Sequence, residues 1–160
     1  MTMHKISVLF VCLGNICRSP MAEFIFKDKV QKAGLSEFIQ IDSAGTAGWH
    51  SGEGMHCGTA DMLDLHKIES NGFRSRQVRK QDITQFDYII GMDDSNIEDL
   101  ERLFGHYPEQ IFKITNLCPQ LTKDHIPDPW YTHNFAETYS LLDQCCEALL
   151  QKIKQQIDKV

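Results

Sequence analysis

One stretch constrains the fold and the chemistry of this chain more than any other: CLGNICRSP, residues 12–20. It follows a short, mostly apolar run at 6–11 that predicts a buried strand. It leads into a helix, because Ser19 is a suitable N-cap and Pro20 suits the first helical position. A loop between a strand and a helix start holds unpartnered backbone N–H groups at the positive end of the helix dipole. The stretch therefore predicts an anion-binding site.

The side chains of this stretch differ from those of a nucleotide-binding loop, because no Gly-Lys-Ser/Thr sequence is present. Arg18 can donate two parallel N–H groups to a tetrahedral oxyanion. The same positive field favours the thiolate form of Cys12, and Ser19 can hydrogen-bond that sulfur. Gly14 and Asn15 allow a positive φ, so that successive N–H groups can turn inward. We predict a nucleophile at the bottom of an oxyanion cup; the alternative is a buried cysteine and a surface arginine that share the stretch by chance.

Length and composition indicate one globular domain. The chain has 160 residues, 42% of them hydrophobic and 24% charged, which is usual for a soluble protein with a proper core. A net charge of −6 argues against binding to nucleic acid or to an anionic membrane surface. No apolar run approaches the length of a membrane span, and the N-terminal run lacks the features of a signal peptide. We therefore expect a cytoplasmic protein.

The six cysteines are expected to be free thiols, because nothing indicates a secreted protein. We also expect no metal and no other cofactor. There is no CxxC pair, and the adjacent pairs at 56–57 and 145–146 lack the spacing of metal ligands.

Expected strands and helices alternate along the chain, which predicts an α/β fold with a parallel sheet. The strands are expected near residues 5–11, 38–43, 88–92 and 111–114. The helices are expected near residues 19–33 and 59–66, from a cap at Asp93 or Ser95 to about 104, and after a cap at Asn134. Ligands of such sheets bind at the carboxyl ends of the strands. Residues 116–133 are expected to form a long loop, a class of segment that is often functional.

The sequence VCLGNICRSP, followed by MAE, resembles the phosphate loop of the low-molecular-weight protein tyrosine phosphatases. Three further segments resemble that family in the same order: DSAGT at 42–46, FDYIIGMD at 86–93 and IPDPWY at 126–131. The resemblance covers nearly the whole chain. It implies one domain over residues 1–160, with a flavodoxin-like, four-stranded parallel sheet of strand order 2-1-3-4 and helices on both faces.

The leaving group of a phosphotyrosine needs a proton, and the donor must lie opposite the attacking sulfur. Asp128 is the candidate, because Pro127 and Pro129 restrict the backbone around it. In the resembled family the matching aspartate is the general acid, and its conjugate base then activates water to hydrolyse the phosphocysteine. A turn residue without chemistry is the alternative. Asp93 also matches a family position, but near a helix start we expect it to be a cap.

Several residues are expected to bind the phosphate, line the substrate pocket or support the loop. The expected phosphate-binding residues are Leu13, Gly14, Asn15, Ile16, Cys17, Arg18 and Ser19. Trp49, Trp130 and Tyr131 are candidates for an aromatic slot whose depth would exclude phosphoserine, although each could be ordinary packing. By resemblance, Asn15, Ser19 and Ser43 support the loop.

Three positions carry further expectations. By resemblance, an Ile at position 16 fits tyrosine-type enzymes, whereas arginine-phosphate phosphatases of this fold tend to carry Thr. The family often has a His where this chain has Phe73. The basic cluster of Arg74, Arg76, Arg79 and Lys80 is either a solvated loop or an attractor of acidic phosphopeptides.

The leading interpretation is a monomeric protein tyrosine phosphatase that uses covalent cysteine catalysis without a metal. Its partners would be tyrosine-phosphorylated proteins or peptides, with inorganic phosphate as product and competitive ligand. We also predict that oxidants can link Cys12 to Cys17 in a protective disulfide.

Two alternatives remain open from the sequence. A thiol-coupled arsenate reductase shares the loop but needs two more relay cysteines, and residues 58–117 contain none. A non-catalytic phosphate-binding or redox-sensing module would keep Arg18 but would not need Asp128 between two prolines.

Overall fold

Parallel strands form the centre of the structure, which is a computed structural model that describes residues 5–158. The strands are β1 (Ile6–Cys12), β2 (Ile39–Gly45), β3 (Tyr88–Gly91) and β4 (Ile111–Lys113). Their order in the sheet is β2-β1-β3-β4, and all three pairings are parallel. The predicted flavodoxin-like order is therefore confirmed.

The apolar run of β1 is continuous because both faces of the sheet are covered. Val8 and Phe10 belong to the hydrophobic cluster on one face, and Leu9 and Val11 belong to the cluster on the other. All four side chains are fully buried. The strand is thus held from both sides up to Cys12, where the loop begins.

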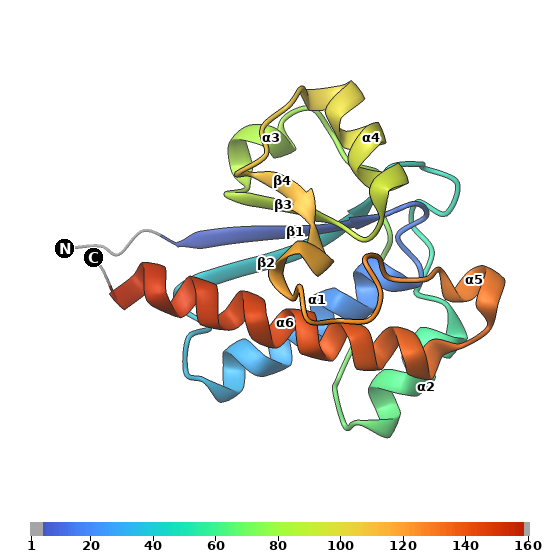
Figure 1. Cartoon of the computed structure of the whole chain (residues 1–160). Helices are drawn as coiled ribbons and strands as arrows, with labels where there is room; N and C mark the ends of the chain where they lie inside the picture. The colour runs from blue at the N-terminus through green and yellow to red at the C-terminus, as the bar shows by residue number, and fades with distance from the viewer. Residues whose placement is uncertain (1–4, 159–160) are drawn as a thin grey trace.

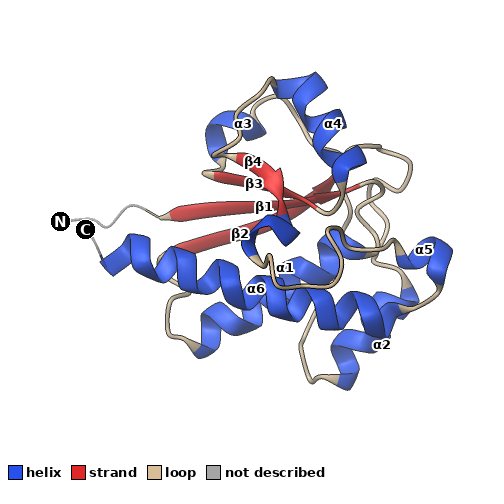
Figure 2. Cartoon of the chain, in the orientation of Figure 1, coloured by secondary structure: helices blue, strands red, loops and turns tan. Residues whose placement is uncertain are grey.

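Helices lie on both sides of the sheet (Figure 1). In that view α1 (Arg18–Lys32), α2 (Cys57–Leu65) and α6 (Phe135–Asp158) lie below it, whereas α3 (Asp82–Gln85) and α4 (Asp94–Phe104) lie above it. Figure 2 shows the same layers by secondary structure. A 3-10 helix, η1 (Ile114–Leu117), follows β4, and the short helix α5 (Pro129–Thr132) precedes α6. None of the helices within residues 5–158 combines the length and apolarity that a bilayer crossing requires.

The structure corrects two predictions about the elements. Helix α1 begins at Arg18 with Cys17 as its N-cap, so the prediction of Ser19 as the cap was wrong. Ser19 lies inside the first turn, and its hydroxyl faces the sulfur of Cys12. The expected long loop at 116–133 contains the end of η1 and all of α5.

The strand register brings the carboxyl ends of the strands to one edge of the sheet. Cys12 pairs with Gly45 of β2, and Val11 pairs with Gly91 of β3. The segments that follow β1, β2 and β3 therefore start beside one another. This is the edge where a ligand of a parallel α/β sheet binds.

Candidate active site

The loop between β1 and α1 offers backbone donors to a ligand. Among the described residues, no backbone carbonyl accepts a hydrogen bond from the N–H groups of residues 13–17. Asn15 has a φ of 56°, which reverses the chain within the loop. A series of buried N–H groups without acceptors is costly unless a ligand or water pairs with them. The loop therefore has the character of an anion cradle.

Glycines allow this loop to lie close to its neighbours. Gly14 permits a positive φ, but it does not adopt one; within the loop Asn15 does. A Cβ at Gly14 would lie 3.1 Å from Cδ2 of His50, so a larger residue would press on that side chain. A Cβ at Gly45 would lie 2.8 Å from the carbonyl oxygen of Leu13, so β2 can pass the loop only as glycine.

The sulfur of Cys12 lies at the base of the loop and is 3% exposed as a residue. Sγ is 3.0 Å from Ser19 Oγ and 3.4 Å from the backbone N of Ser19. Behind Ser19, Asn15 Nδ2 donates to Ser19 Oγ at 2.8 Å and to Ser43 Oγ at 3.0 Å. The three residues predicted to support the loop are thus joined by hydrogen bonds, and one end of this group contacts the sulfur.

Arg18 is buried, and its Nε has no partner among the described residues. Its Nη1 donates to Asp93 Oδ2 at 2.7 Å and to the carbonyl of Ile126 at 2.9 Å. Its Nη2 lies 3.5 Å from Asp128 Oδ2, and among the described residues Nε has no acceptor. Burial lowers the pKa of Arg18, but Cys12, Asp93 and Asp128 together outweigh burial and raise it. A permanently charged guanidinium with an unpartnered Nε can receive an oxyanion.

Asp93 has a second role that the sequence did not reveal. It caps α4 as predicted, because Oδ1 accepts from the backbone N of Asn96 at 2.8 Å. Its other oxygen holds Arg18 Nη1. The start of α4 therefore fixes the orientation of the guanidinium.

Asp128 lies at the N-cap of α5, where Oδ1 accepts from the backbone N of Trp130 at 3.0 Å. Oδ2 points toward Arg18, and the side chain is 20% exposed. The two alternatives for this residue do not exclude each other, because one oxygen caps the start of α5 while the residue lines the same cavity as Cys12.

A cavity of about 260 Å³ joins these groups. It is lined by Cys12, Leu13, Gly14, Ile16, Cys17, Arg18, Trp49, His50, Asp128, Trp130 and Tyr131. Trp49 and Tyr131 are 73% and 72% exposed, so the aromatic residues surround the mouth and the loop forms the bottom. The structure thus brings every predicted pocket residue to the cavity, while Asn15, Ser19 and Ser43 lie behind it.

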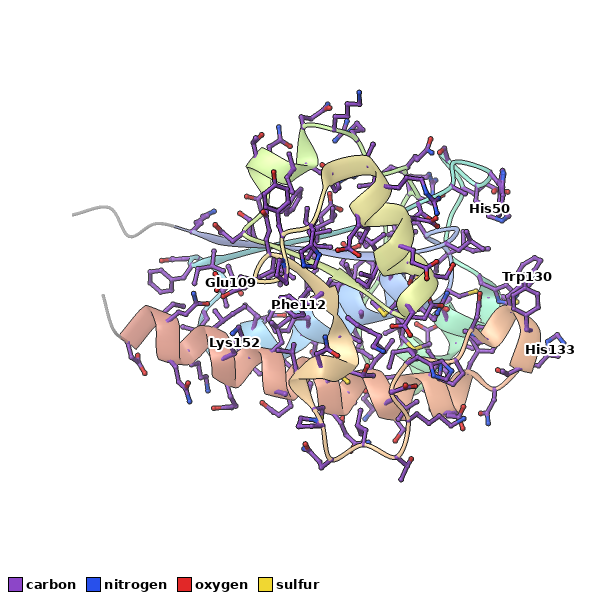
Figure 3. The ribbon with its side chains drawn as sticks, turned by 45° about the horizontal axis from the view of Figure 1, so that its top comes forward. His50, Glu109, Phe112, Trp130, His133 and Lys152 are labelled. Carbon is purple, nitrogen blue, oxygen red and sulfur yellow. The ribbon has the colours of Figure 1, made fainter. Side chains whose placement is uncertain are left out.

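His50 was not predicted from the sequence. Its Nδ1 lies 2.6 Å from Glu53 Oε2, and its ring centroid is 6.2 Å from that of Trp130. Figure 3 shows His50 and Trp130 at the same end of the molecule, away from Lys152. A histidine in a glycine-rich loop has no local pattern that would indicate contact with a distant helix.

Other charged and thiol groups near the loop are structural. Burial, with smaller contributions from Cys12 and Asp128, raises the pKa of Cys17 to about 12, so this thiol stays neutral. Arg76, from the basic cluster, pairs with Asp42 at 3.1 Å and with Asp82 at 3.0 Å. Arg76 is therefore neither a solvated loop residue nor a free cation that could attract an acidic phosphopeptide. Within residues 5–158 no group of three or more His, Cys, Asp or Glu side chains is placed to hold a metal ion.

Comparison with known proteins assigns this chain to a family. A family model described as low molecular weight phosphotyrosine protein phosphatase matches residues 7–159. The chain belongs to the low-molecular-weight protein tyrosine phosphatase family. It is 46% identical over 152 residues to low molecular weight protein-tyrosine-phosphatase YfkJ of Bacillus subtilis, with 94% of this chain and 97% of that protein covered. It is 38% identical over 148 residues to PtpA of Staphylococcus epidermidis, with 92% and 94% covered.

Solved structures of the low-molecular-weight phosphatases share this fold. The crystal structure of YfkJ matches with a TM-score of 0.93 at 45% identity and 98% coverage of both chains. The Drosophila arginine phosphatase DARP matches with a TM-score of 0.83 at 33% identity, over 92% of this chain and 97% of that one. Relatives of this fold are thus named for different phosphoamino acids.

Proposed function

We propose that this chain is a protein tyrosine phosphatase that hydrolyses phosphotyrosine in proteins or peptides through a phosphocysteine on Cys12. The observation that carries the proposal is the unpartnered Nε of buried Arg18, in the same cavity as the Cys12 sulfur and beside a loop with free N–H groups. A buried donor without an acceptor is costly, and a phosphoryl group would supply three acceptor oxygens.

In the first step the Cys12 thiolate attacks phosphorus and an S–P bond forms. The bond from phosphorus to the tyrosyl oxygen breaks, and that oxygen takes the proton of the Asp128 carboxylic acid. The loop N–H groups and the Nε/Nη2 edge of Arg18 hold the charge on the three other oxygens. The Ser19 hydroxyl hydrogen-bonds the sulfur before the attack.

In the second step water attacks the phosphocysteine. The Asp128 carboxylate takes a proton from that water, the S–P bond breaks, and the electron pair returns to the Cys12 sulfur. Inorganic phosphate then leaves the cradle, so it acts as a competitive ligand as well as a product. The proximity of Asp128 Oδ2 to Arg18 supports this role, because the carboxyl faces the cation that holds the phosphoryl oxygens.

The walls of the cavity support an aromatic substrate. Trp49 lies in the loop after β2, and Trp130 and Tyr131 lie on α5. These side chains surround a bottom lined by Ile16 and Leu13. A tyrosyl ring would pack between these side chains while its phosphate reaches the loop. A phosphoserine would not span the same depth.

The test is a panel of phosphotyrosine, phosphoserine, phosphothreonine and phosphoarginine peptides, with arsenate plus a dithiol as a separate arm. We expect release of phosphate from phosphotyrosine to exceed release from the other peptides by at least about 10²-fold in kcat/KM. A preference for phosphoarginine would transfer the assignment to the activity for which DARP is named. Reduction of arsenate without hydrolysis of any phosphopeptide would identify a reductase instead.

A further inference from the structure

Glu23 is a buried carboxylate that the proposed mechanism does not use. It lies on α1, and its side chain is only 5% exposed. One oxygen accepts from Ser43 Oγ at 2.5 Å and the other from Lys27 Nζ at 2.6 Å. A buried carboxylate costs free energy unless it is paired and hydrogen-bonded, and both conditions are met here. Its contact with Ser43 joins it to the hydrogen bonds that end at the Cys12 sulfur.

The direction of these hydrogen bonds follows from Asn15. The backbone N–H of Arg76 can only donate, and it contacts one amide atom of Asn15 at 3.0 Å, so that atom is the carbonyl Oδ1. The amide nitrogen therefore faces Ser19 Oγ and Ser43 Oγ and donates to both. Both hydroxyl oxygens are acceptors toward Asn15, and each keeps its own proton to donate elsewhere.

The hydroxyl protons of Ser43 and Ser19 face the two ends of this hydrogen-bond network, which are Glu23 and the Cys12 sulfur. A carboxylate can only accept, so the Ser43 hydroxyl donates to Glu23. At the other end, Ser19 Oγ lies 3.0 Å from Cys12 Sγ and 3.4 Å from the carbonyl of Ala44. When Cys12 is a thiolate it can only accept, so the Ser19 hydroxyl then donates to the sulfur.

We propose that Glu23 and Lys27 form a positioning pair that keeps Asn15 donating to Ser19, and Ser19 donating to the Cys12 sulfur. Neither residue touches the substrate. The effect of the pair on turnover rests on the proposed function, whereas its effect on the Cys12 thiolate does not.

Lys27 keeps the carboxylate charged. Burial raises the pKa of Glu23, and Asp42 adds to this, while Lys27 and the Ser43 hydroxyl oppose it. Asp42 is itself paired with the positive charge of Arg76, whose Nε and Nη2 lie 3.2 Å and 3.1 Å from Asp42 Oδ2. Without Lys27, Glu23 would become a neutral acid at a higher pH, and a neutral acid can donate to Ser43 instead of accepting.

Aromatic side chains hold Lys27 in place. Its Nζ lies 4.8 Å from the centroid of the Phe24 ring, a cation–π contact. Phe24 in turn packs edge-on against Phe73, with the ring centroids 6.0 Å apart. Phe73 therefore contributes to this pair through packing.

The test compares Lys27→Met and Lys27→Arg with a matched control, Lys32→Met. Lys32 forms an i,i+4 pair with Asp28 on the same helix, at 2.9 Å, but that pair does not contact the loop. The readouts are the rate of Cys12 alkylation by iodoacetamide, located by mass spectrometry, and kcat and KM for an aryl phosphate. Both are measured at pH 6 and at pH 8, with the melting temperature as a check on folding.

For Lys27→Met we expect Cys12 alkylation and kcat to fall by roughly 3- to 10-fold at pH 6 and by less than about 2-fold at pH 8. The difference arises because the raised pKa of Glu23 leaves more neutral acid at the lower pH. KM should change by less than about 2-fold. Lys27→Arg keeps the cation. Both Lys27→Arg and Lys32→Met should therefore have the wild-type alkylation rate, kcat and KM.

If Cys12 of the Lys27→Met variant were alkylated at the wild-type rate at both pH values, the proposal would be overturned. An equal loss at both pH values together with a lower melting temperature would also overturn it, because that result indicates a merely structural role. Glu23→Gln, if it folds, should alkylate slowly at both pH values; if it does not fold, the Lys27 series decides. A wild-type protein that hydrolyses no aryl phosphate would refute the proposed function, while the alkylation comparison would still test the pair.

Discussion

The bottom and the mouth of the cavity are built in different ways. At the bottom, residues 12–19 are largely buried, and Cys12 and Arg18 are each 3% exposed. At the mouth, Trp49, Trp130 and Tyr131 are half to three-quarters exposed, and His50 is held by a surface glutamate. The fold thus fixes the proposed reacting groups before any ligand arrives, while the side chains proposed to contact the phosphorylated partner lie where substitution costs little stability.

The largest effect is expected from the bottom, at Cys12. Cys12→Ser replaces the attacking thiolate by a hydroxyl that stays protonated, so kcat should fall by at least about 10⁴-fold. The loop N–H groups and Arg18 remain, so a phosphotyrosine peptide should still bind. Steady-state kinetics and calorimetry measure the two quantities. Turnover within 10-fold of the wild type would contradict the assignment of the nucleophile.

Arg18→Ala is the contrasting variant at the bottom. It removes the donor edge that faces the cavity, so inorganic phosphate should lose its ability to inhibit or to protect Cys12 from alkylation. Retention of phosphate binding by Arg18→Ala would show that the anion binds elsewhere.

An intermediate effect is expected where the two regions meet, at Asp128. Asp128→Ala removes the proton donor, and kcat for phosphotyrosine should fall by about 10²- to 10⁴-fold. The loss should be much smaller for esters whose leaving group is very acidic, because those leave without a proton. A plot of kcat against leaving-group acidity measures this directly. The same loss for every leaving group would argue that Asp128 only caps α5.

A smaller effect is expected at the mouth. Trp49→Ala should raise KM for a phosphotyrosine peptide by roughly 3- to 10-fold and leave kcat within about 2-fold, because an aromatic contact contributes about 0.5–1.5 kcal/mol. The melting temperature should not change, since the side chain is 73% exposed. If Trp49→Ala lowered kcat and left KM unchanged, the mouth of the cavity would act on turnover as the bottom does, and the proposed division between the two regions would be wrong.

The smallest effect is expected at Cys17, although it lies in the loop. Burial raises the pKa of its thiol to about 12, so Cys17 stays protonated from pH 5 to pH 9 and adds no charge to the cradle. Iodoacetamide at neutral pH should label Cys12 and the exposed Cys57 at least about 10-fold faster than Cys17. Peptide mapping by mass spectrometry measures the order of labelling, and fast labelling of Cys17 would contradict it.

The same property bears on the predicted disulfide between Cys12 and Cys17. Peroxide would convert Cys12 to a sulfenic acid, and attack by Cys17 would form the S–S bond and release water. Because Cys17 is a neutral thiol, we expect this closure to be faster at pH 9 than at pH 7. Recovery of Cys12 only as sulfonic acid at both pH values would rule the disulfide out.

Local patterns predicted the bottom of the site better than its surroundings. A buried strand, a loop and a helix start follow one another within residues 6–20, and the positions of β1 and α1 depend on little else. The partners of Arg18 could not be predicted in the same way. Asp93 and Ile126 lie far along the chain, and only the packed fold shows that they converge on one guanidinium.

Two other features were missed for related reasons. The charge of Glu23 gives no sign of burial in a sequence, because an acidic residue on a helix is usually solvated. Helix α5 has only four residues and begins with a proline, so its pattern is too short to distinguish from a loop. The burial of Glu23 also depends on Ser43, which is 20 residues away in the sequence.

Helix α5 places two unlike components on one small unit. Its first cap, Asp128, is the candidate proton donor, and its second residue, Trp130, forms part of the cavity wall. Exchange of residues 126–133 between relatives would therefore change the candidate proton donor and the wall that contacts the ligand at the same time. In directed evolution of this scaffold, libraries that vary the opposite wall at 49–50 would be the safer route to a new specificity, because they leave the acid undisturbed.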